Sequence, residues 1–568
     1  MENIRLDIGA DSIGVAWLDA PGLPFNVFSE SMMSDLESLI DFAQNELAGL
    51  VLTSRKSAFA AGADLAMIKD FADMRFDASR ESMRQRFSRL GRLFRALEQL
   101  PIPTVAAING LALGGGLEVA MSCHARVCAD IAAPILGLPE VSLGLLPGAG
   151  GTQRLPRYIG VRKAMKMLLG GAPITPAAAL ENGLLSDVVP GEVLIDRACT
   201  LVRQSRAQAL WDNPRWQADQ ADLEFLESDE WYSYCLEAGG WAKRPHHLYP
   251  AVDAIIRCVS GGVPLSLEAG CDLEWDVFVE LMSDPVAANM VTTCFLNKMA
   301  APKRAQRTVA DRDSGIGSIC WESGEPQPGS LLRKLPQTGA RQASIVIADA
   351  GASPTQDALH LLEIRTAKTT NETAATQLQF AGILADAEAI ELMNPEAPAA
   401  GQAVSLTRDM AKLPVWVKHP GVMQRVLDAL QIQASPHGDS DADIKAAAAS
   451  VELDGMFRFC RGSAAAIATG EDAVTPSGLN LLTVTALAAY ACLLDGTIAD
   501  PEMLDVLAVY GIGFPKWTGG PIGFLAMVQR REIEVKSLDA KLLAAVQAIE
   551  VPLKIKAGYN PSIVSRAG

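Results

Sequence analysis

Histidine, paired cysteine and positive charge are all scarce in this chain of 568 residues. The 6 histidines and 10 cysteines form no CxxC pair and no other spacing typical of metal ligands. Structural zinc sites and disulfide frameworks depend on such spacings, so we expect reduced thiols and no metal site. A formal net charge of −17 argues against nucleic acid as a partner, because contact with a phosphate backbone needs clustered Lys and Arg.

A long apolar run is also missing. No stretch reaches the roughly 18 uninterrupted apolar residues of a membrane span. The N-terminus has no signal-peptide pattern and leads directly into an alternating segment at Ile4–Ile8, so we expect a cytoplasmic protein without a membrane span. The composition, 49% hydrophobic and 20% charged residues, is that of an ordinary globular protein, and the length predicts several domains.

Residues 1–195 alternate short β-rich segments with amphipathic ones. Such alternation is typical of an α/β fold with parallel strands. We expect strands at 4–8, 14–18, 49–53 and 104–108, and helices at 29–45 and 81–99.

Changes of pattern divide the rest of the chain. Residues 196–300 have a helical pattern, and we expect 265–299 to be one long linker helix. Residues 301–342 mix Lys, Arg, Gly, Pro and Ser without periodicity, as a linker between domains does. An apolar strand at Ser344–Ala348 opens the segment 343–430, and helices rich in Ala and Leu fill 431–568.

Three segments carry most of the chemical information. The sequence NGLALGGGLE at 109–118 sets a glycine turn at the head of a helix and places Glu118 one turn into it. A second carboxylate, Glu140, follows in LPEVSLGLLPGAGGTQR at 138–154, and AFAAGADL at 58–65 precedes both. Each feature alone is common, since a helical glutamate is usually solvated and a glycine triplet is often only a turn. Their occurrence together in this order indicates a catalytic site.

Together the three segments resemble the crotonase (enoyl-CoA hydratase/isomerase) superfamily over residues 1–195. The resemblance implies a spiral of repeated ββα units and activity on a CoA thioester. It implies that Glu118 activates water and that Glu140 exchanges the proton at the α-carbon. The backbone N–H groups of Ala63 and Gly115 would form the oxyanion hole, because preorganised donors stabilise the enolate charge on a thioester oxygen.

The same resemblance implies where CoA binds. The backbone at Ala61, Gly62 and Asp64 would hold the adenine. Arg55 and Lys56, just upstream, are candidates for the CoA phosphates, although a solvated basic loop is an equally good interpretation. Nothing in the sequence determines the acyl group.

The whole length also resembles a multifunctional enzyme of fatty-acid β-oxidation, in which a hydratase precedes a 3-hydroxyacyl-CoA dehydrogenase. The sequence YGIGFPKWTGGP at 510–521 carries this resemblance, with support from 392–395 and 409–421. It implies a shortened, Rossmann-like, nucleotide-binding-like remnant at 343–430. A helical domain like the C-terminal domain of the dehydrogenase would follow at 431–568.

The departures from the dehydrogenase pattern concern its cofactor. A dinucleotide site needs a G-x-G-x-x-G turn between the first strand and helix. Here the strand at Ser344–Ala348 is followed by DAGASP, with one glycine and an acidic residue where a diphosphate would approach. The GIG at 315–317 follows no expected strand, and the position of the catalytic histidine is Glu391. We therefore predict no NAD site, no other cofactor and no dehydrogenase activity.

These observations predict a 2-enoyl-CoA hydratase that converts a trans-2-enoyl-CoA to a 3-hydroxyacyl-CoA in the β-oxidation of fatty or other carboxylic acids. Retention of both glutamates favours hydration within the superfamily. The alternatives are an enoyl-CoA isomerase or crotonase-type hydrolase, a bifunctional hydratase/dehydrogenase, and a non-catalytic acyl-CoA-binding scaffold. The expected partners are the acyl-CoA substrate and either further copies of the chain or another β-oxidation enzyme such as a thiolase.

Overall fold

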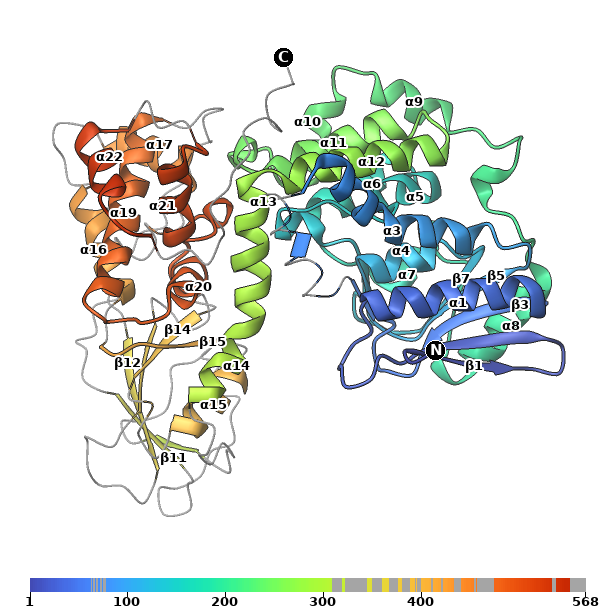
Figure 1. Ribbon diagram of the computed structural model, residues 1–568, viewed down its shortest axis with the longest axis horizontal. Coiled ribbons are helices and arrows are strands. Elements are labelled where there is room, and N and C mark those ends of the chain that lie inside the picture. The colour runs from blue at the N-terminus through green and yellow to red at the C-terminus, as the bar shows by residue number, and fades with distance from the viewer. Residues whose placement is uncertain are drawn as a thin grey trace. The chain divides into compact units, whose positions relative to one another are not determined.

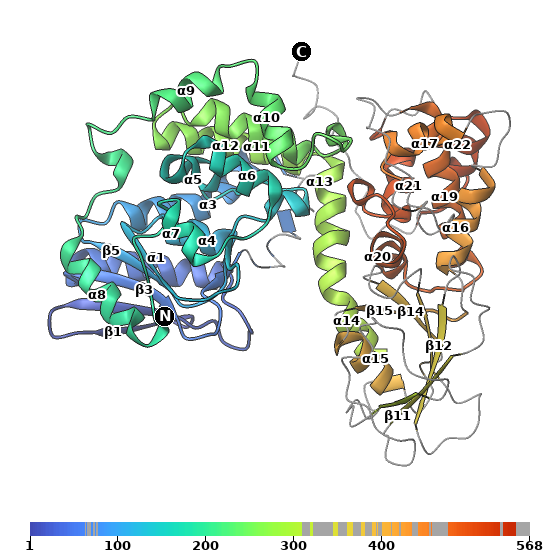
Figure 2. The same ribbon diagram turned by 180° about the vertical axis from the view of Figure 1, so that it is seen from behind.

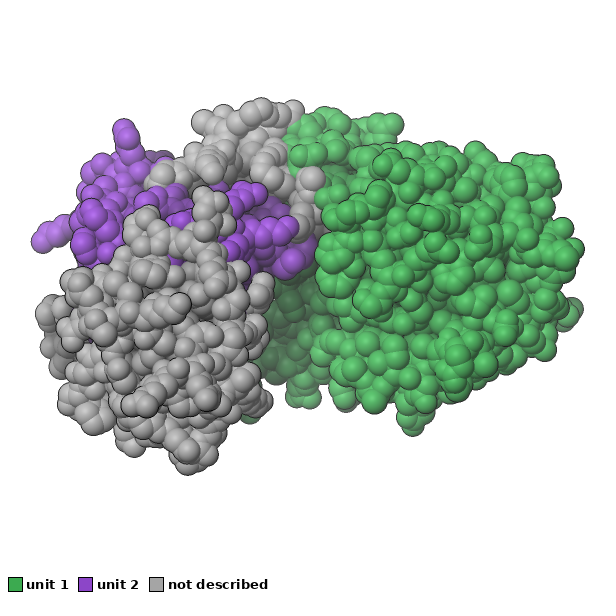
Figure 3. Space-filling model, turned by 90° about the horizontal axis from the view of Figure 1, so that it is seen from below, with its two compact units in different colours: residues 1–288, 555–568 green, residues 289–554 purple. Residues whose placement is uncertain are grey.

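In the computed structural model the chain divides into two compact units, residues 1–288 and residues 289–554 (Figure 3). The first is described throughout except for scattered positions between 63 and 77. Beyond residue 288 the structure describes 289–308, 319–321, 345–349, 360–366, 376–380, 389–393, 395, 400–409, 412–419, 422–433, 441–453, 456, 475–533 and 538–551.

Two sheets form the centre of the first unit (Figure 1). The strands of the larger sheet are, in spatial order, β1 (Ile4–Ile8), β2 (Ile13–Leu18), β3 (Gly49–Ser54), β5 (Thr104–Ile108), β7 (Ala125–Ala129) and β9 (Asp187–Val189). The smaller sheet contains β4 (Ala60–Ala61), β6 (Ala112–Leu113) and β8 (Leu136–Gly137). Apart from the antiparallel β1–β2 hairpin, all of these pairings are parallel.

Successive segments of the chain add one strand to each sheet in turn. The pairs β3–β4, β5–β6 and β7–β8 each place a longer strand in the large sheet and a short one in the small sheet. Every residue of β3, β5 and β7 is buried, as expected for parallel strands covered on both faces. The predicted α/β fold with its spiral of ββα units is therefore confirmed for this part of the chain, as are the four predicted strands.

Helices cover these sheets. They are α1 (Glu30–Glu46), α3 (Arg80–Glu98), α4 (Gly115–Met121), α5 (Gly151–Ile159), α6 (Val161–Gly170), α7 (Pro176–Glu181) and α8 (Leu194–Gln204). The predictions for α1 and α3 hold to within one residue. The hydroxyls of Ser29 and Ser79 accept hydrogen bonds from the N–H groups of Met32 and Ser82, which satisfies donors that a helix start leaves unpaired.

The last part of the first unit is helical. It contains α9 (Gln220–Leu226), α10 (Trp231–Ala238), α11 (Pro250–Gly262) and α12 (Leu267–Met282). Helices α11 and α12 pack on each other and on α5. In both ribbon views these three helices lie on the side of α3 and α4 that faces away from the strands (Figures 1 and 2).

The single long helix predicted over 265–299 is wrong. Helix α12 is followed instead by α13 (Pro285–Met290), a π-helical turn η5 (Val291–Asn297) and α14 (Lys298–Thr308). The break has a local cause, because Pro285 lacks the N–H that would continue the helix and Asp284 Oδ1 accepts a bond from the N–H of Val286.

The stretch 301–342, predicted to be a linker, contains regular structure. Helix α14 continues to Thr308, and β10 (Ile319–Trp321) pairs with β11 (Ile345–Asp349). The rest of this stretch lies outside the described residues.

The sheet of the second unit differs from the parallel sheet of a Rossmann-like domain. After β10 and β11 it contains β12 (His360–Thr366), β13 (Thr376–Phe380), β14 (Ala389–Met393) and β15 (Leu413–Trp416), in sequential order. Three successive pairings, from β11 to β14, are antiparallel. The connections at 350–359, 367–375 and 381–388 are shorter than the roughly dozen residues that a parallel crossover requires. The Rossmann-like arrangement is thus not confirmed.

The described helices of the second unit include α15 (Ala400–Asp409), α16 (Val422–Gln433), α17 (Asp441–Ser450), α19 (Pro476–Leu494), α20 (Pro501–Gly511), α21 (Pro521–Arg530) and α22 (Ala540–Gln547). The predicted helical C-terminal region is therefore present. Helix α19 is long and apolar enough to cross a membrane by composition alone, with 56% of its apolar window buried. It packs against α16, α17 and α21, as the central helix of a bundle does.

Candidate active site

The three segments singled out in the sequence contain or directly follow three neighbouring strands of the small sheet. Strand β4 lies beside β6, and β6 beside β8, with Ala61 opposite Leu113 and Leu113 opposite Gly137. Parallel strands end at the same edge of a sheet, so the residues that follow them lie together. The fold therefore brings the start of α4 close to Glu140, as the sequence predicted.

Glycines allow the backbone segments to meet at this edge. A Cβ on Gly116 would stand 2.2 Å from the carbonyl oxygen of Ala60, a distance that no side chain tolerates. Gly114 has a φ of +55°, and a Cβ there would stand 2.7 Å from Oε1 of Glu140. The glycine run thus holds the start of α4 against β4 and against the second carboxylate.

Glu118 is buried, with 3% of its surface exposed. Its Oε1 accepts hydrogen bonds from the N–H groups of Ala149 and Gly151, each at 2.8 Å. Burial raises the pKa of Glu118 to about 7, while these two bonds and the charge of Arg154 act in the opposite direction. Within the described residues no group donates to Oε2 of Glu118, so that oxygen can hold a further ligand.

Glu140 opens the short 3-10 helix η1 (Glu140–Leu143) that follows β8. Its Oε2 is buried, and no described group donates a hydrogen bond to it. Burial, followed by the charge of Glu118, raises the pKa of Glu140 well above its usual range. The backbone N–H of Glu140 itself acts in the opposite direction, but burial outweighs it and favours the protonated state.

A third carboxylate, Glu274, belongs to the same region. It lies on α12 and is 0% exposed. Its Oε1 accepts from the N–H of Gly150 at 2.7 Å, and its Oε2 accepts from the N–H of Thr152 at 3.1 Å and from the Thr152 hydroxyl. Burial, followed by the charge of Glu118, raises the pKa of Glu274 to about 8.

Sequence reasoning missed Glu274, although one signal was present. The residues of α12 at positions 267, 270, 274, 277 and 281 are all buried and lie on one face by helical spacing. Glu274 therefore occupies an apolar position of an amphipathic pattern, where a charged residue is expected only if it is paired.

Of the two predicted oxyanion-hole residues, the structure describes Gly115. Gly115 is the first residue of α4, and no described residue accepts a hydrogen bond from its N–H. An unpaired N–H at this position is expected, because the first N–H groups of a helix have no partner within it. Ala63 lies outside the described residues.

Three of the predicted CoA-binding residues lie in or directly after β4 of the small sheet. Ala61 ends β4, and Gly62 and Asp64 follow it. Arg55 is exposed, with its guanidinium carbon 5.8 Å from the centroid of the Trp17 ring. Lys56 is engaged by the protein itself, since its Nζ donates to the carbonyl oxygens of Ala20 and Leu23 at 2.6 and 2.5 Å.

Glu391, which the sequence resemblance aligns with the dehydrogenase histidine, has a structural partner. It lies on β14 and is 0% exposed, and its Oε1 accepts a hydrogen bond of 2.7 Å from the N–H of Met423 at the start of α16. A carboxylate suits a helix N-terminus, where unpaired N–H groups and the helix dipole favour negative charge. The GIG at 315–317 and the residues 350–354 lie outside the described residues.

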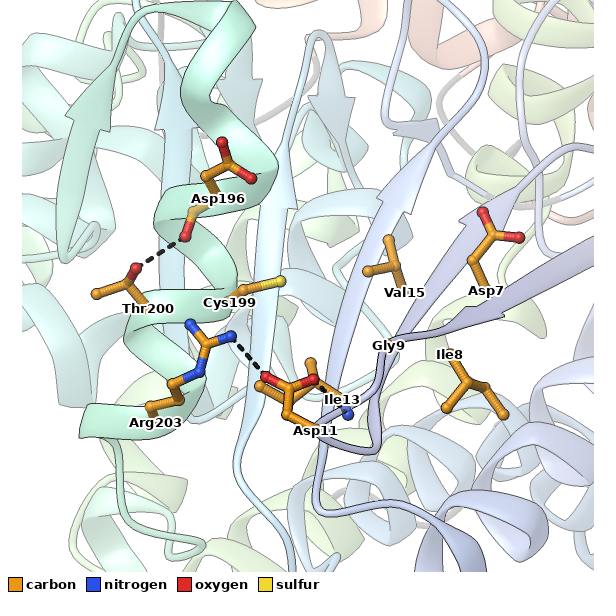
Figure 4. Close-up of a pocket in the computed structure, with 10 residues that line it drawn as sticks. All are labelled: Asp7, Ile8, Gly9, Asp11, Ile13, Val15, Asp196, Cys199, Thr200 and Arg203. Carbon is orange, nitrogen blue, oxygen red and sulfur yellow. Dashed lines mark hydrogen bonds and ion pairs between the residues drawn. The ribbon is translucent and has the colours of Figure 1, made fainter.

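A separate cavity of about 580 Å³ lies in the first unit between the β1–β2 hairpin and α8 (Figure 4). The side chains of Asp11 and Arg203 point toward each other there and form an ion pair of 2.5 Å. None of the predicted site residues lines this cavity. Three aspartates in its lining, Asp7, Asp11 and Asp196, make it a poor place for a phosphate-bearing ligand.

Comparisons with known proteins give matches in the part of the chain that contains this site. The family model described as enoyl-CoA hydratase/isomerase matches residues 10–214. The chain is similar to the fatty acid oxidation complex subunit alpha of Idiomarina loihiensis, with 38% identity over 284 residues that cover 49% of this chain and 39% of that protein. It is also similar to the subunit of that name from Shewanella halifaxensis, with 35% identity over 56% of this chain and 42% of that protein.

The chain thus spans less than half the length of these curated relatives. Among solved structures, the enoyl-CoA hydratase from Bacillus anthracis is 29% identical, with a match that covers 49% of this chain and 89% of that one at a TM-score of 0.32. The matched family, the ββα spiral and the paired carboxylates coincide in the same part of the chain. Residues 10–214 are therefore the part of the chain that is similar to the enoyl-CoA hydratase/isomerase family.

Proposed function

We propose that this protein is a 2-enoyl-CoA hydratase, which adds water to a trans-2-enoyl-CoA to give a 3-hydroxyacyl-CoA in the β-oxidation of fatty or other carboxylic acids. One observation carries the proposal: two carboxyl groups shielded from water, Glu118 and Glu140, interact with each other and have different hydrogen-bond partners. Pairs of titratable groups whose surroundings differ in this way divide acid and base roles between them. The cytoplasm is the compartment that goes with this role.

The environments support a particular division of labour. Glu118 accepts two N–H bonds, which favour its charged form and suit a base that takes a proton from water. The water oxygen forms its new bond to C3 of the enoyl group, and the π electrons move toward the thioester oxygen. Glu140, held protonated by burial, gives its proton to C2. The pair carries one proton before and after the step, and that proton changes place.

The enolate oxygen needs donors during this step. The N–H of Gly115 supports this role, because no described residue uses it and it stands at the positive end of α4. The second donor in the proposal is the N–H of Ala63. CoA would lie along Ala61, Gly62 and Asp64, with Arg55 close to the phosphates.

We further propose that the second unit has no dehydrogenase activity. The buried, hydrogen-bonded state of Glu391 supports this, because a carboxylate committed to a helix N-terminus is a poor replacement for a catalytic histidine. The second unit would then serve as a structural partner of the hydratase or as a docking element for another β-oxidation enzyme.

The experiment that tests the hydratase is a cofactor-free assay of the full chain with short, long and ring-bearing 2-enoyl-CoA thioesters. Loss of the conjugated-thioester absorbance is followed in the wild type and in Glu118→Gln and Glu140→Gln. We expect turnover in the wild type and a loss of about 10²–10⁴-fold in each variant, as for removal of a general acid or base. Full activity in either variant contradicts the assignment.

Product mass separates the alternatives, since hydration adds one water and isomerisation adds none. Free CoA as a product indicates a hydrolase, and binding without any turnover indicates a scaffold. The dehydrogenase question has its own readout, in which a 3-hydroxyacyl-CoA and NAD are mixed with the full chain. We expect no NADH absorbance, and its appearance would establish a bifunctional enzyme.

A further inference from the structure

The turn at 148–152 has two sides. The N–H groups of Ala149 and Gly151 point to Glu118, and those of Gly150 and Thr152 point to Glu274. Consecutive backbone donors of one turn thus bind two carboxylates from different helices, α4 on one side and α12 on the other.

The hydrogen bonds between Glu274 and the turn are shielded from water, and both oxygens of Glu274 take part in them. Glu274 is 0% exposed, as is Thr152, whose hydroxyl donates to Oε2 of Glu274. Gln153 Nε2 in turn donates to the Thr152 hydroxyl at 3.0 Å and to the carbonyl oxygen of Cys258 on α11 at 2.8 Å. The turn is therefore anchored to both α11 and α12, and water has no access to replace these bonds.

The backbone of the turn needs this anchor. Gly150 has a φ of +97°, and the turn leads directly into α5, whose first N–H groups have no partners inside the helix. Without an acceptor for Gly150 and Thr152, two buried donors would be left unsatisfied, which destabilises this arrangement of the turn. The turn would then shift to satisfy them and would carry the donors of Glu118 with it.

We propose that Glu274 is a positioning residue for Glu118: it fixes the turn at 148–152 so that the N–H groups of Ala149 and Gly151 hold the catalytic carboxylate in place. The inference rests on the proposed hydratase function of Glu118. Glu274 itself touches neither water nor substrate in this role. It lies on a helix outside the matched residues 10–214, so α12 contributes to the catalytic geometry of a domain that ends before it.

The charged groups around Glu274 determine how the pH profile of a Glu274 variant is interpreted. Glu118 on α4, Arg154 on α5 and Glu140 on η1 face it, with the Cys258 thiol on α11. Burial raises the pKa of both carboxyls, to about 8 for Glu274 and to about 7 for Glu118. Removing Glu274 takes the acceptor away from the N–H groups of Gly150 and Thr152, and the N–H bonds that a shifted turn withdraws from Glu118 would raise the pKa of Glu118.

The first measurement needs no activity. Hydrogen exchange of the peptide that covers 148–152 is followed by mass spectrometry in the full-length wild type, Glu274→Gln, Glu274→Leu and the control Glu280→Gln. Glu280 lies on the same helix but forms its ion pair with Arg80 at a more exposed position. We expect at least tenfold faster exchange of the turn amides in Glu274→Leu, a smaller increase in Glu274→Gln, and wild-type exchange in the control.

The second measurement is the pH profile of turnover in the same variants. We expect kcat to fall by about 10- to 100-fold in Glu274→Leu with little change in KM, as for misplacement of a catalytic group. The acid limb of the profile should move to higher pH. A variant that only packs poorly would lose stability without moving this limb.

Thr152→Val keeps the proposal testable if the Glu274 variants fail to fold. It removes the hydroxyl donor but keeps the shape, and we expect a smaller shift of the acid limb in the same direction, which Thr152→Ser reverses. Unchanged exchange and an unchanged acid limb in Glu274→Gln and Thr152→Val would overturn the inference while wild-type hydration stands. No hydration by the wild type would overturn the proposed function instead. The exchange data would then still show whether Glu274 holds the turn at 148–152 in place.

Discussion

Oε1 of Glu140 lies 2.7 Å from the point at which a Cβ on Gly114 would stand, so a side chain at position 114 would collide with the second carboxylate. Gly114 also has a φ of +55° and a ψ of −127° at the N-cap of α4, a conformation that side chains rarely adopt. The residue before the predicted oxyanion donor is thus constrained twice, by backbone conformation and by the carboxylate.

Gly114→Ala is expected to lose hydratase activity by about 10²-fold or more, because the methyl group displaces Glu140 or the N–H of Gly115. The fall should appear in kcat, since the substitution leaves the proposed CoA contacts in place. Steady-state kinetics with one 2-enoyl-CoA measures it, and Gly170→Ala is a suitable control because a Cβ there meets nothing within 4 Å. Equal activity in both variants would show that the close approach has no catalytic consequence.

The buried carboxyls predict that stability falls as the pH rises. The pKa of Glu140 is raised by burial and by the charge of Glu118, so the folded state keeps a proton that the unfolded chain loses near pH 4.5. Above pH 4.5 the unfolded state binds fewer protons, and each such group costs about 1.4 kcal/mol per pH unit until its folded pKa is reached. For Glu118 and Glu274 the corresponding windows end at about pH 7 and pH 8.

Glu140→Gln removes this cost, because the amide does not titrate. The melting temperature of the variant relative to the wild type should therefore increase from pH 5 to pH 8, although its activity is lost. Calorimetry at the two pH values measures the difference. A melting-temperature difference that does not change with pH would mean that Glu140 titrates normally in the folded protein.

The turn at 148–152 has a second support, the buried ion pair between Arg154 and Glu98. Two guanidinium nitrogens of Arg154 bind the Glu98 carboxylate at 2.9 and 3.1 Å, and Nη1 donates to the carbonyl oxygen of Ala149 at 3.0 Å. Arg154→Met leaves the buried Glu98 carboxylate without its hydrogen bonds from Arg154. The substitution is expected to destabilise the first unit by about 3–5 kcal/mol.

Thermal unfolding checks this expectation. Arg203→Ala, which removes the exposed pair with Asp11, should melt close to the wild type because exposed ion pairs contribute little. Similar losses in both variants would argue that the Arg154 pair is worth no more than a surface contact.

Substitutions of Arg55 and Lys56 are expected to weaken the binding of CoA esters for different reasons. Arg55→Ala removes an exposed charge and should raise KM for the acyl-CoA several-fold at low salt, with the effect declining as salt screens it. Lys56→Ala also frees the carbonyl oxygens of Ala20 and Leu23, so the melting temperature should fall as well. A pantetheine thioester, which lacks the nucleotide phosphates, is the matched substrate, and an equal KM increase with it would exclude phosphate contact by Arg55.

Much of the first unit could be predicted from local sequence. Strands such as β3 and β5 are short apolar runs that only a buried parallel sheet uses, and α1 and α3 begin at serines that cap them. Glu118 and Glu140 were identifiable because their motifs occur together in an order that resembles the crotonase superfamily, and the structure brings these motifs to one edge of the small sheet. The order of β4, β6 and β8 follows directly from the order of the motifs in the chain.

Other features depend on contacts between distant residues. The site depends on the donors at Ala149 and Gly151, on the burial of the Glu140 carboxyl and on the hydrogen bonds of Glu274 to the turn. Glu140 lies 22 residues after Glu118 in the chain, and Glu274 lies 156 residues after it. The strand order of the second sheet likewise depends on pairing, since an apolar strand can join a parallel or an antiparallel neighbour. Sequence alone thus determined which residues can carry the chemistry, whereas the tertiary structure decided their protonation and their support, because burial and hydrogen bonding are properties of the packed environment.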